Sequence, residues 1–216
     1  AYGRRIFSSS PAGVPVVSVG NLTAGGSGKT PLTVLLAREL AAAGRKPAIL
    51  MRGYRATPGG VSDEAALYRR LLPETILEVN PDRRAGAAAA AEQGADVILL
   101  DDGMQHLGLR RDFDLVLIDA TSPWGGGNTI PGGLLREPRR ALAGAAAVII
   151  TRSDQVPRKA VSALEKEIGR LAPEAPVFTA RHRPARLVRL DNTPVPLDAL
   201  RGRNVVALSS IARPEA

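Results

Sequence analysis

The sequence predicts an α/β fold, in which helices flank a mostly parallel sheet. Short β-branched apolar runs alternate with longer segments of helical periodicity along most of the 216 residues. This alternation is typical of parallel strands that are joined by crossover helices. Apolar residues make up 44% of the chain and aromatic residues only 3%, so we expect a core built from aliphatic side chains.

The first half of the chain carries the clearest alternation. A first helix presents four leucines on one predicted face, and Gly44 ends it as a left-handed cap. Ser62 is the expected N-cap of a second helix, where Asp63 and Glu64 suit the positive end of the helix dipole. The expected strands are Val14–Val19, Ala48–Met51, Ile76–Val79 and Val97–Leu100, the expected helices are Lys29–Ala43, Asp63–Leu72 and Asp82–Gln93, and the leucines are Leu32, Leu35, Leu36 and Leu40.

The second half repeats the pattern with longer irregular segments. Proline and glycine cluster at 122–133, which predicts an ordered surface loop. Residues 181–204 are rich in arginine and proline and suggest the approach to a second lobe. The expected strands are Leu115–Asp119, Val148–Thr151 and short ones near Val177, Leu187 and Val205, and the expected helix is Arg158–Leu171.

A phosphate-binding loop follows the first strand. The segment reads TAGGSGKT and leads directly into the first helix. In such a loop small residues let backbone N–H groups turn toward phosphates, Lys29 reaches the β- and γ-phosphates, and the Thr30 hydroxyl binds Mg²⁺. The common pattern has glycine five positions before Gly28, where this chain has Thr23. The residues expected to bind the nucleotide are Thr23, Ala24, Gly25, Gly26, Ser27, Gly28, Lys29 and Thr30.

Two adjacent carboxylates follow another strand. Asp101 and Asp102 end the apolar run 97–100, and α/β sheets bind ligands at the carboxyl ends of their strands. Phosphate-loop enzymes hold Mg²⁺ or its waters with such a carboxylate. Gln105 and His106 come next and place an amide and an imidazole beside this site, with the histidine as an orienting group rather than a catalyst.

Further polar segments follow the other expected strands. For each of them the alternative is a solvated surface charge, but their shared position at strand exits favours a role in phosphate chemistry. These segments are Arg52–Tyr54, Asp63–Glu64, Arg83 at the head of a helix, and 125–138, which combines glycines with Asn128, Arg136 and Glu137.

The charge balance is basic, with 29 Lys and Arg against 21 Asp and Glu and a net charge of +8. The arginine-rich composition is equally explained by a GC-rich genome or by attraction to a nucleotide, a nucleic acid or an anionic lipid surface. The absence of cysteine excludes disulfides and thiolate metal sites. No apolar run approaches the ~20 residues of a membrane span, and no signal peptide is recognisable.

Seven motifs together resemble the tetraacyldisaccharide 4′-kinase family of lipid A biosynthesis. They occur in the family's order and cover nearly the whole chain. The family's phosphate loop is similar to T-x-G-G-[ST]-G-K-T, which accounts for Thr23. The motifs are VPVVSVGNLTAGGSGKTP (14–31), MRGY (51–54), VSDE (61–64), DRRA (82–85), DDGMQH (101–106), GNTIPGGLLREP (127–138) and ALSSIARPE (207–215).

The resemblance implies transfer of the γ-phosphoryl group of ATP to the 4′-hydroxyl of a tetraacylated glucosamine disaccharide 1-phosphate. The product is lipid IVA, formed at the cytoplasmic face of the inner membrane of Gram-negative bacteria. The implied cofactors are ATP and Mg²⁺, and the implied partners are the acylated lipid and an anionic membrane surface, without nucleic acid. The implied catalytic residues are Asp63 as the base, Lys29, Arg83 and Arg136; the metal residues are Thr30, Asp101, Asp102 and Glu137; and Gln105 and His106 join the nucleotide site.

The resemblance also implies a division of the chain. We expect a basic N-terminal segment (1–13), a phosphate-loop kinase core (14–180) and a linker that starts a C-terminal lobe (181–216). The family adds an apolar N-terminal helix and an Asp-His-His segment in its C-terminal lobe, so we expect missing pieces at both ends. The arginines expected at an anionic leaflet are Arg4, Arg5, Arg181, Arg183, Arg186 and Arg189.

Two other classes use a similar loop and sheet. A nucleic-acid-binding ATPase would explain the positive charge, although one Trp, three Tyr and three Phe offer few stacking residues. A regulatory or metallochaperone GTPase would carry Asn-Lys-x-Asp after a late strand, where this chain has Thr-Arg-Ser-Asp at 151–154.

Overall fold

The computed structural model describes residues 9–53, 62–184, 186–191 and 193–206. Within them, parallel strands alternate with helices along the chain. The elements are β1 (Val16–Asn21), α1 (Lys29–Ala42), β2 (Pro47–Met51), α2 (Asp63–Leu71), β3 (Ile76–Val79), α3 (Arg83–Glu92), β4 (Val97–Asp101), β5 (Phe113–Asp119), the 3₁₀ helix η2 (Arg139–Gly144), β6 (Ala147–Thr151), α4 (Arg158–Leu171), β7 (Val177–Thr179), β8 (Leu187–Val188), β9 (Pro194–Val195) and the 3₁₀ helix η3 (Leu197–Leu200).

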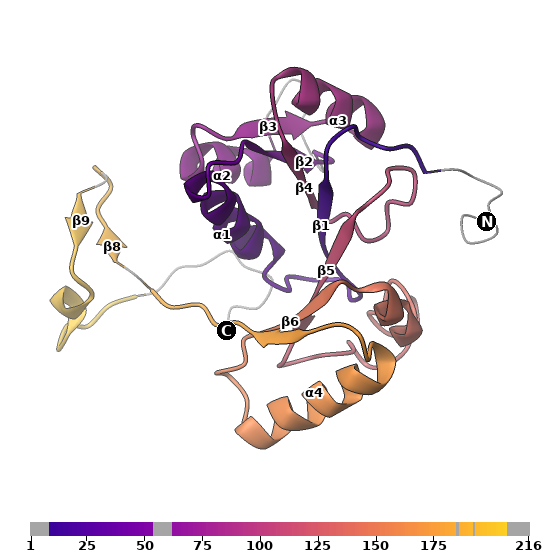
Figure 1. Ribbon diagram of the computed structural model, residues 1–216. Coiled ribbons are helices and arrows are strands. Elements are labelled where there is room, and N and C mark those ends of the chain that lie inside the picture. The colour runs from indigo at the N-terminus through magenta and orange to yellow at the C-terminus, as the bar shows by residue number, and fades with distance from the viewer. Residues whose placement is uncertain (1–8, 54–61, 185, 192, 207–216) are drawn as a thin grey trace.

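The main sheet has seven strands in the order β3-β2-β4-β1-β5-β6-β7, and every neighbouring pair is parallel (Figure 1). The predicted fold class is therefore confirmed. β1 lies at the centre, between β4 and β5. Because parallel strands end at the same edge, the segments after β1 and β4 leave the sheet side by side.

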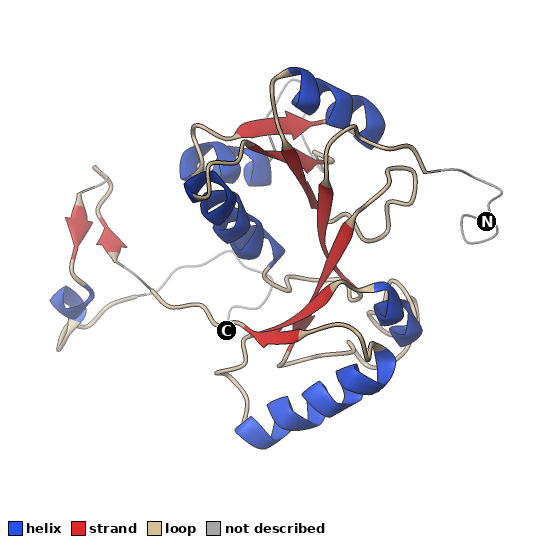
Figure 2. Ribbon diagram, viewed as in Figure 1, coloured by secondary structure: helices blue, strands red, loops and turns tan. Residues whose placement is uncertain are grey.

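Helices cover both faces of this sheet (Figure 2). Alternate residues of each strand face opposite cores, as a pleated strand requires. On β4, Leu99 packs with α1 and α2, whereas Ile98 and Leu100 pack with α3. On β5, Val116 and Ile118 pack with α4, while Leu117 faces the core beside α1. The result is a three-layer arrangement with an aliphatic core, as the composition predicts.

The boundaries of the first elements have local causes. β1 starts at Val16 rather than at the predicted Val14, because Pro15 has no N–H to donate to a neighbouring strand. Gly44, at φ +78°, ends α1 as predicted: its N–H donates to the Ala41 carbonyl at 3.0 Å. Ser62 is confirmed as the N-cap of α2, since its Oγ accepts the Ala65 N–H at 3.3 Å.

The predicted leucine face of α1 is partly wrong. Leu32, Leu36 and Leu40 pack against the cores, but Leu35 is 52% exposed. The fully buried positions of α1 are instead small or β-branched, because this face lies directly on the closely packed central strands. They are Thr33, Val34 and Ala37.

β8 and β9 form a separate antiparallel ribbon, which lies apart from the main sheet (Figure 1). The strand expected near Val205 is wrong for the described part of the chain: Val205 and Val206 form no strand and are 59% and 97% exposed. The motif at 207–215, Arg4, Arg5 and Tyr54 lie outside the described residues.

Within the described ranges, no helix has both the length and the apolar character needed to cross a membrane.

Candidate active site

The loop after β1 and the carboxylates after β4 meet at the carboxyl edge of the sheet. The Lys29 Nζ donates to the Asn21 Oδ1 at 2.8 Å and lies 3.4 Å from the Asp102 Oδ1. Lys29 is the first residue of α1, and Asn21 is the last residue of β1. The expected convergence of the two segments is therefore confirmed.

The loop leaves the start of α1 open. Gly28 precedes the helix in the left-handed region, at φ +91° and ψ 22°, and as a glycine it has no side chain to cap the first helical N–H groups. Such N–H groups, together with the helix dipole, attract an anion. The loop is anchored from β6, because the Thr151 hydroxyl donates to the Ser27 carbonyl at 2.8 Å. The Ser27 Oγ is buried without a hydrogen-bond partner in the described structure.

A second loop is held against the first one. The Ala24 N–H donates to the Leu134 carbonyl at 2.7 Å, and the Arg136 N–H donates to the Leu22 carbonyl at 2.6 Å. The glycine-rich segment before it is more than the predicted surface loop, because Trp124 is only 9% exposed and its Nε1 donates to Glu167 at 2.9 Å. These contacts bring residues 136 and 137 to the site.

Arg136 joins this loop to the carboxylate pair. The Arg136 Nη1 donates to Asp102, at 2.8 Å to Oδ2 and 3.0 Å to Oδ1. Gln105 donates its Nε2 to the Glu137 Oε1 at 3.1 Å and to the Asn21 carbonyl at 3.2 Å. One hydrogen-bond network therefore joins the end of β1 to three residues that are distant from the phosphate loop in the sequence. They are Gln105, Arg136 and Glu137.

Asp101 and Asp102 occupy opposite electrostatic environments. Burial raises the pKa of Asp101 to about 6, although the Tyr68 hydroxyl acts against the shift. The Asp101 side chain is 5% exposed; its Oδ2 accepts the Tyr68 hydroxyl at 2.8 Å, and its Oδ1 has no hydrogen-bond partner within the described structure. For Asp102, burial favours the neutral acid, but Lys29 and Arg136 prevail and lower its pKa.

Tyr68 and Thr30 lie close together beside Asp101. Burial and the Asp101 carboxylate raise the pKa of Tyr68, while the hydroxyls of Thr33 and Thr30 act in the opposite sense. Tyr68 therefore stays protonated and remains a hydrogen-bond donor. The predicted magnesium residues Thr30 and Asp101 thus share one neighbour.

Arg83 is a buried cation on the same edge of the sheet. It is 4% exposed, and its Nη1 donates to the Asn80 carbonyl at 2.9 Å, while the Nε has no partner in the described chain. Burial and nearby Arg52 lower the pKa of Arg83, and Asp101 and Asp102 oppose that shift. Such a desolvated guanidinium close to the carboxylates suits an anionic ligand.

His106 lies among cations. Burial, Arg83 and Arg111 together lower its pKa, so the ring is neutral near pH 7. The Arg111 Nη1 donates to the His106 carbonyl at 2.6 Å and fixes this turn. The expected orienting role of His106 stays a prediction.

Asp63 opens α2 and is exposed. The negative charge of its neighbour Glu64 helps to raise the pKa of the Asp101 carboxyl. An exposed carboxylate in this place is accessible to an acceptor hydroxyl. The assignment of Asp63 as the base stays a prediction.

No three His, Asp or Glu side chains of the described residues are grouped as a metal site. The donor set nevertheless suits a hard cation, because Asp101 offers an unpartnered carboxylate oxygen and the Thr30 hydroxyl acts on the tyrosine that Asp101 also contacts. Mg²⁺ in nucleotide enzymes takes one or two protein oxygens and fills its other positions with water and phosphate.

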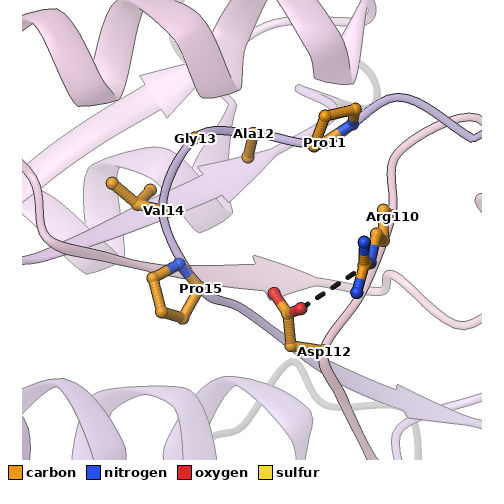
Figure 3. A pocket seen from close by; sticks show the side chains of 7 residues that line it. All are labelled: Pro11, Ala12, Gly13, Val14, Pro15, Arg110 and Asp112. Carbon is orange, nitrogen blue, oxygen red and sulfur yellow. Dashed lines mark ion pairs between the residues drawn. The ribbon is translucent and has the colours of Figure 1, made fainter.

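A separate pocket of about 310 Å³ lies at the opposite edge of the sheet (Figure 3). It is lined by residues before β1 and by Arg110 and Asp112. The Arg110 Nε lies 3.9 Å from the Asp112 Oδ1. Because β1 runs from this pocket toward the phosphate loop, the pocket is not part of the site.

Sequence reasoning missed three residues of the site. Asn21 holds Lys29, Tyr68 holds Asp101, and Thr151 holds the phosphate loop. Asn21 and Thr151 end their strands, so their position at the sheet edge was a usable signal. Tyr68 lies inside a helix and gives no such signal.

A parallel sheet with a phosphate loop after its central strand and a carboxylate after the adjacent strand defines the phosphate-loop class of nucleotide-binding α/β proteins. The family model described as tetraacyldisaccharide-1-P 4′-kinase matches residues 1–216. The chain belongs to this family, and the comparisons do not favour the GTPase or nucleic-acid alternatives.

Relatives named tetraacyldisaccharide 4′-kinase agree with this assignment. That of Anaeromyxobacter sp. strain Fw109-5 is 41% identical over 235 residues, which cover 100% of this chain and 62% of the relative. That of Syntrophobacter fumaroxidans is 40% identical over 222 residues, which cover 93% of this chain and 57% of the relative. The chain thus spans about three fifths of the length of these relatives.

A solved structure is also similar. The "apo" form of LpxK from Aquifex aeolicus in complex with ATP has a TM-score of 0.76 and 30% identity. The match covers 94% of this chain and 65% of that chain.

Proposed function

We propose that the chain forms the catalytic core of a kinase that transfers the γ-phosphoryl group of ATP to the 4′-hydroxyl of a tetraacyldisaccharide 1-phosphate. The product is lipid IVA. The observation that carries the proposal is the junction of Lys29, Asn21 and Asp102 at the end of β1, in a chain of this family. The names of the relatives and the ATP in the similar Aquifex structure support it.

The nucleotide phosphates bind along Thr23–Thr30. The open N–H groups at the start of α1 and the left-handed Gly28 suit a phosphate cradle. Lys29 offsets negative charge on the β- and γ-oxygens, and Arg83 and Arg136 add cations at the same edge. Gln105 and His106 complete the nucleotide side by orienting these groups.

Mg²⁺ fits beside Asp101. The unpartnered Oδ1 of Asp101 and the Thr30 hydroxyl are the best placed ligands. Asp102 and Glu137 are the other two residues expected to contribute to the metal site. A magnesium ion held there would supply charge neutralisation at the phosphate oxygens.

In the transfer itself, Asp63 accepts the proton of the 4′-hydroxyl. The 4′-oxygen forms a bond to the γ-phosphorus as the bond from that phosphorus to the β–γ bridging oxygen breaks, and ADP leaves. Because this transition state is loose, the chain's main contribution is to position groups and neutralise charge. A carboxylate near the hydroxyl is sufficient as the base.

The acceptor is a lipid, so the enzyme acts at the cytoplasmic face of the inner membrane, where it contacts the anionic surface. Exposed arginines after β7 suit the anionic leaflet and the substrate phosphate. They are Arg181, Arg183, Arg186 and Arg189.

The assignment of the base is tested by separating turnover from nucleotide binding in the whole protein. Asp63→Asn is expected to lower kcat by about 100-fold or more, in the range of general-base effects, and to leave the Kd for ATP unchanged. Lys29→Ala should impair both quantities. Glu74→Gln, at an exposed carboxylate in the turn after α2, serves as the matched control. Wild-type turnover in Asp63→Asn would remove Asp63 from the mechanism.

A further inference from the structure

Tyr68 is a core residue whose hydroxyl makes a hydrogen bond to a carboxylate. It is 1% exposed and packs with Met51 and Leu99 between α2 and the sheet. Its hydroxyl donates to the Asp101 Oδ2 at 2.8 Å. A buried tyrosine needs a hydrogen-bond partner, but here the partner is a charged group that is itself 5% exposed.

The donor that bonds to each aspartate determines whether that carboxylate can still bind a cation. Asp102 is paired with two cations, Lys29 and Arg136, at 3.4 and 2.8 Å. Asp101 receives its hydrogen bond from a neutral hydroxyl, and its second oxygen has no partner in the part of the chain that the structure describes. A neutral donor fixes the direction of a carboxylate without cancelling its charge, so Asp101 keeps a free oxygen for an external cation.

The same hydrogen bond connects two elements of the site. Tyr68 lies on α2, five residues after Asp63, and Asp101 is the last residue of β4. The hydroxyl therefore ties the helix that carries the expected base to the strand that carries the expected metal ligand.

We propose that Tyr68 is a positioning residue, which holds Asp101 so that its free oxygen faces the magnesium of bound Mg·ATP. This inference rests on the proposed function of the site. Because Tyr68 acts through Asp101, its contribution should appear only when the metal is present.

The test measures the Kd for ATP twice, with Mg²⁺ and with EDTA, for wild type and Tyr68→Phe. Tyr68→Phe keeps the ring and removes the hydroxyl. We expect the Kd with Mg²⁺ to rise by about 10-fold, as for other supports of metal ligands, while the Kd with EDTA stays unchanged. Ser18→Ala is the matched control, since its buried Oγ has no hydrogen-bond partner in the described structure. It should leave both Kd values unchanged.

A double variant separates this role from a general loss of structure. In the Asp101→Asn background, adding Tyr68→Phe should change the Kd with Mg²⁺ no further. This comparison also serves if Tyr68→Phe alone folds poorly, because no buried carboxylate loses its donor in the double variant.

Two results would overturn the inference. One is an equal Kd with Mg²⁺ in wild type and Tyr68→Phe, and the other is an equal rise with Mg²⁺ and with EDTA. If wild type itself bound ATP no better with Mg²⁺ than with EDTA, the proposed magnesium site would be wrong, whereas a failure of the proposed function would appear as absent phosphate transfer to the lipid.

Discussion

At the scale of residues, the buried Asp101 affects stability as well as chemistry. Its pKa in the folded state, about 6, lies above the ordinary 3.8. The folded state therefore binds this proton more tightly than the unfolded state does, so the contribution of Asp101 to stability falls as pH rises from about 4 to above 6. Asp102 has the opposite sign, since its lowered pKa gives stability that is lost on acidification.

Asp101→Asn should consequently stabilise the metal-free protein at neutral pH. We expect a gain of about 3 kcal/mol at pH 7.5 and almost none near pH 4, since the pKa rises from 3.8 to about 6 and one pKa unit corresponds to about 1.4 kcal/mol. Urea denaturation in EDTA across this pH range measures it. Asp102→Asn is the contrasting variant and should destabilise the protein at pH 7.5, because Lys29 and Arg136 lose their counter-ion. A pH-independent effect of Asp101→Asn would contradict the electrostatic account.

At the scale of elements, replacing two glycines by alanine should change the stability of the protein in opposite directions, although neither site is crowded. Gly44 ends α1 at φ +78°, and a Cβ there would meet nothing within 4 Å. Gly44→Ala should therefore lower the free energy of unfolding by about 1 kcal/mol, through backbone strain alone. Gly169 lies inside α4, also with nothing within 4 Å, so Gly169→Ala should stabilise by up to about 1 kcal/mol. Chemical denaturation of both variants checks the pair, and a stabilising Gly44→Ala would contradict the capping role.

Elements with strong local signals were predictable from the sequence. α4, β3 and the cap at Ser62 have the predicted residues, because periodicity and capping chemistry are local. The pairing of residues 22–24 with 134–136 was not predictable, since it depends on contacts between distant segments. Likewise, Leu35 has the right spacing for the core face of α1 but is half exposed, because the sheet decides which stripe of the helix is buried.

Of the site, the phosphate loop and the carboxylate pair were predictable because each follows a strand directly. Their meeting through Lys29 and Asp102 follows from the adjacency of β1 and β4. The burial of Arg83 and the bond from Tyr68 to Asp101 come from packing across the sheet, and no sequence spacing encodes them.

At the scale of the whole molecule, the net charge of +8 predicts salt-dependent membrane association. The protein should bind phosphatidylglycerol vesicles in co-sedimentation, and binding should fall sharply between about 0.05 and 0.5 M salt as charges are screened. Replacing Arg181, Arg183, Arg186 and Arg189 with glutamine should weaken binding more than the same change of charge on α4. The α4 control set is Arg158, Lys159, Lys166 and Arg170, which are also exposed. Equal losses would show that net charge alone governs the association.

The measurement that tests the central claim most directly follows labelled phosphate from [γ-³²P]ATP into tetraacyldisaccharide 1-phosphate in the presence of Mg²⁺. We expect the whole protein to label the lipid at its 4′-position, and Lys29→Ala to abolish this labelling. A correctly folded wild-type protein that binds Mg·ATP and leaves the lipid unlabelled would contradict the account.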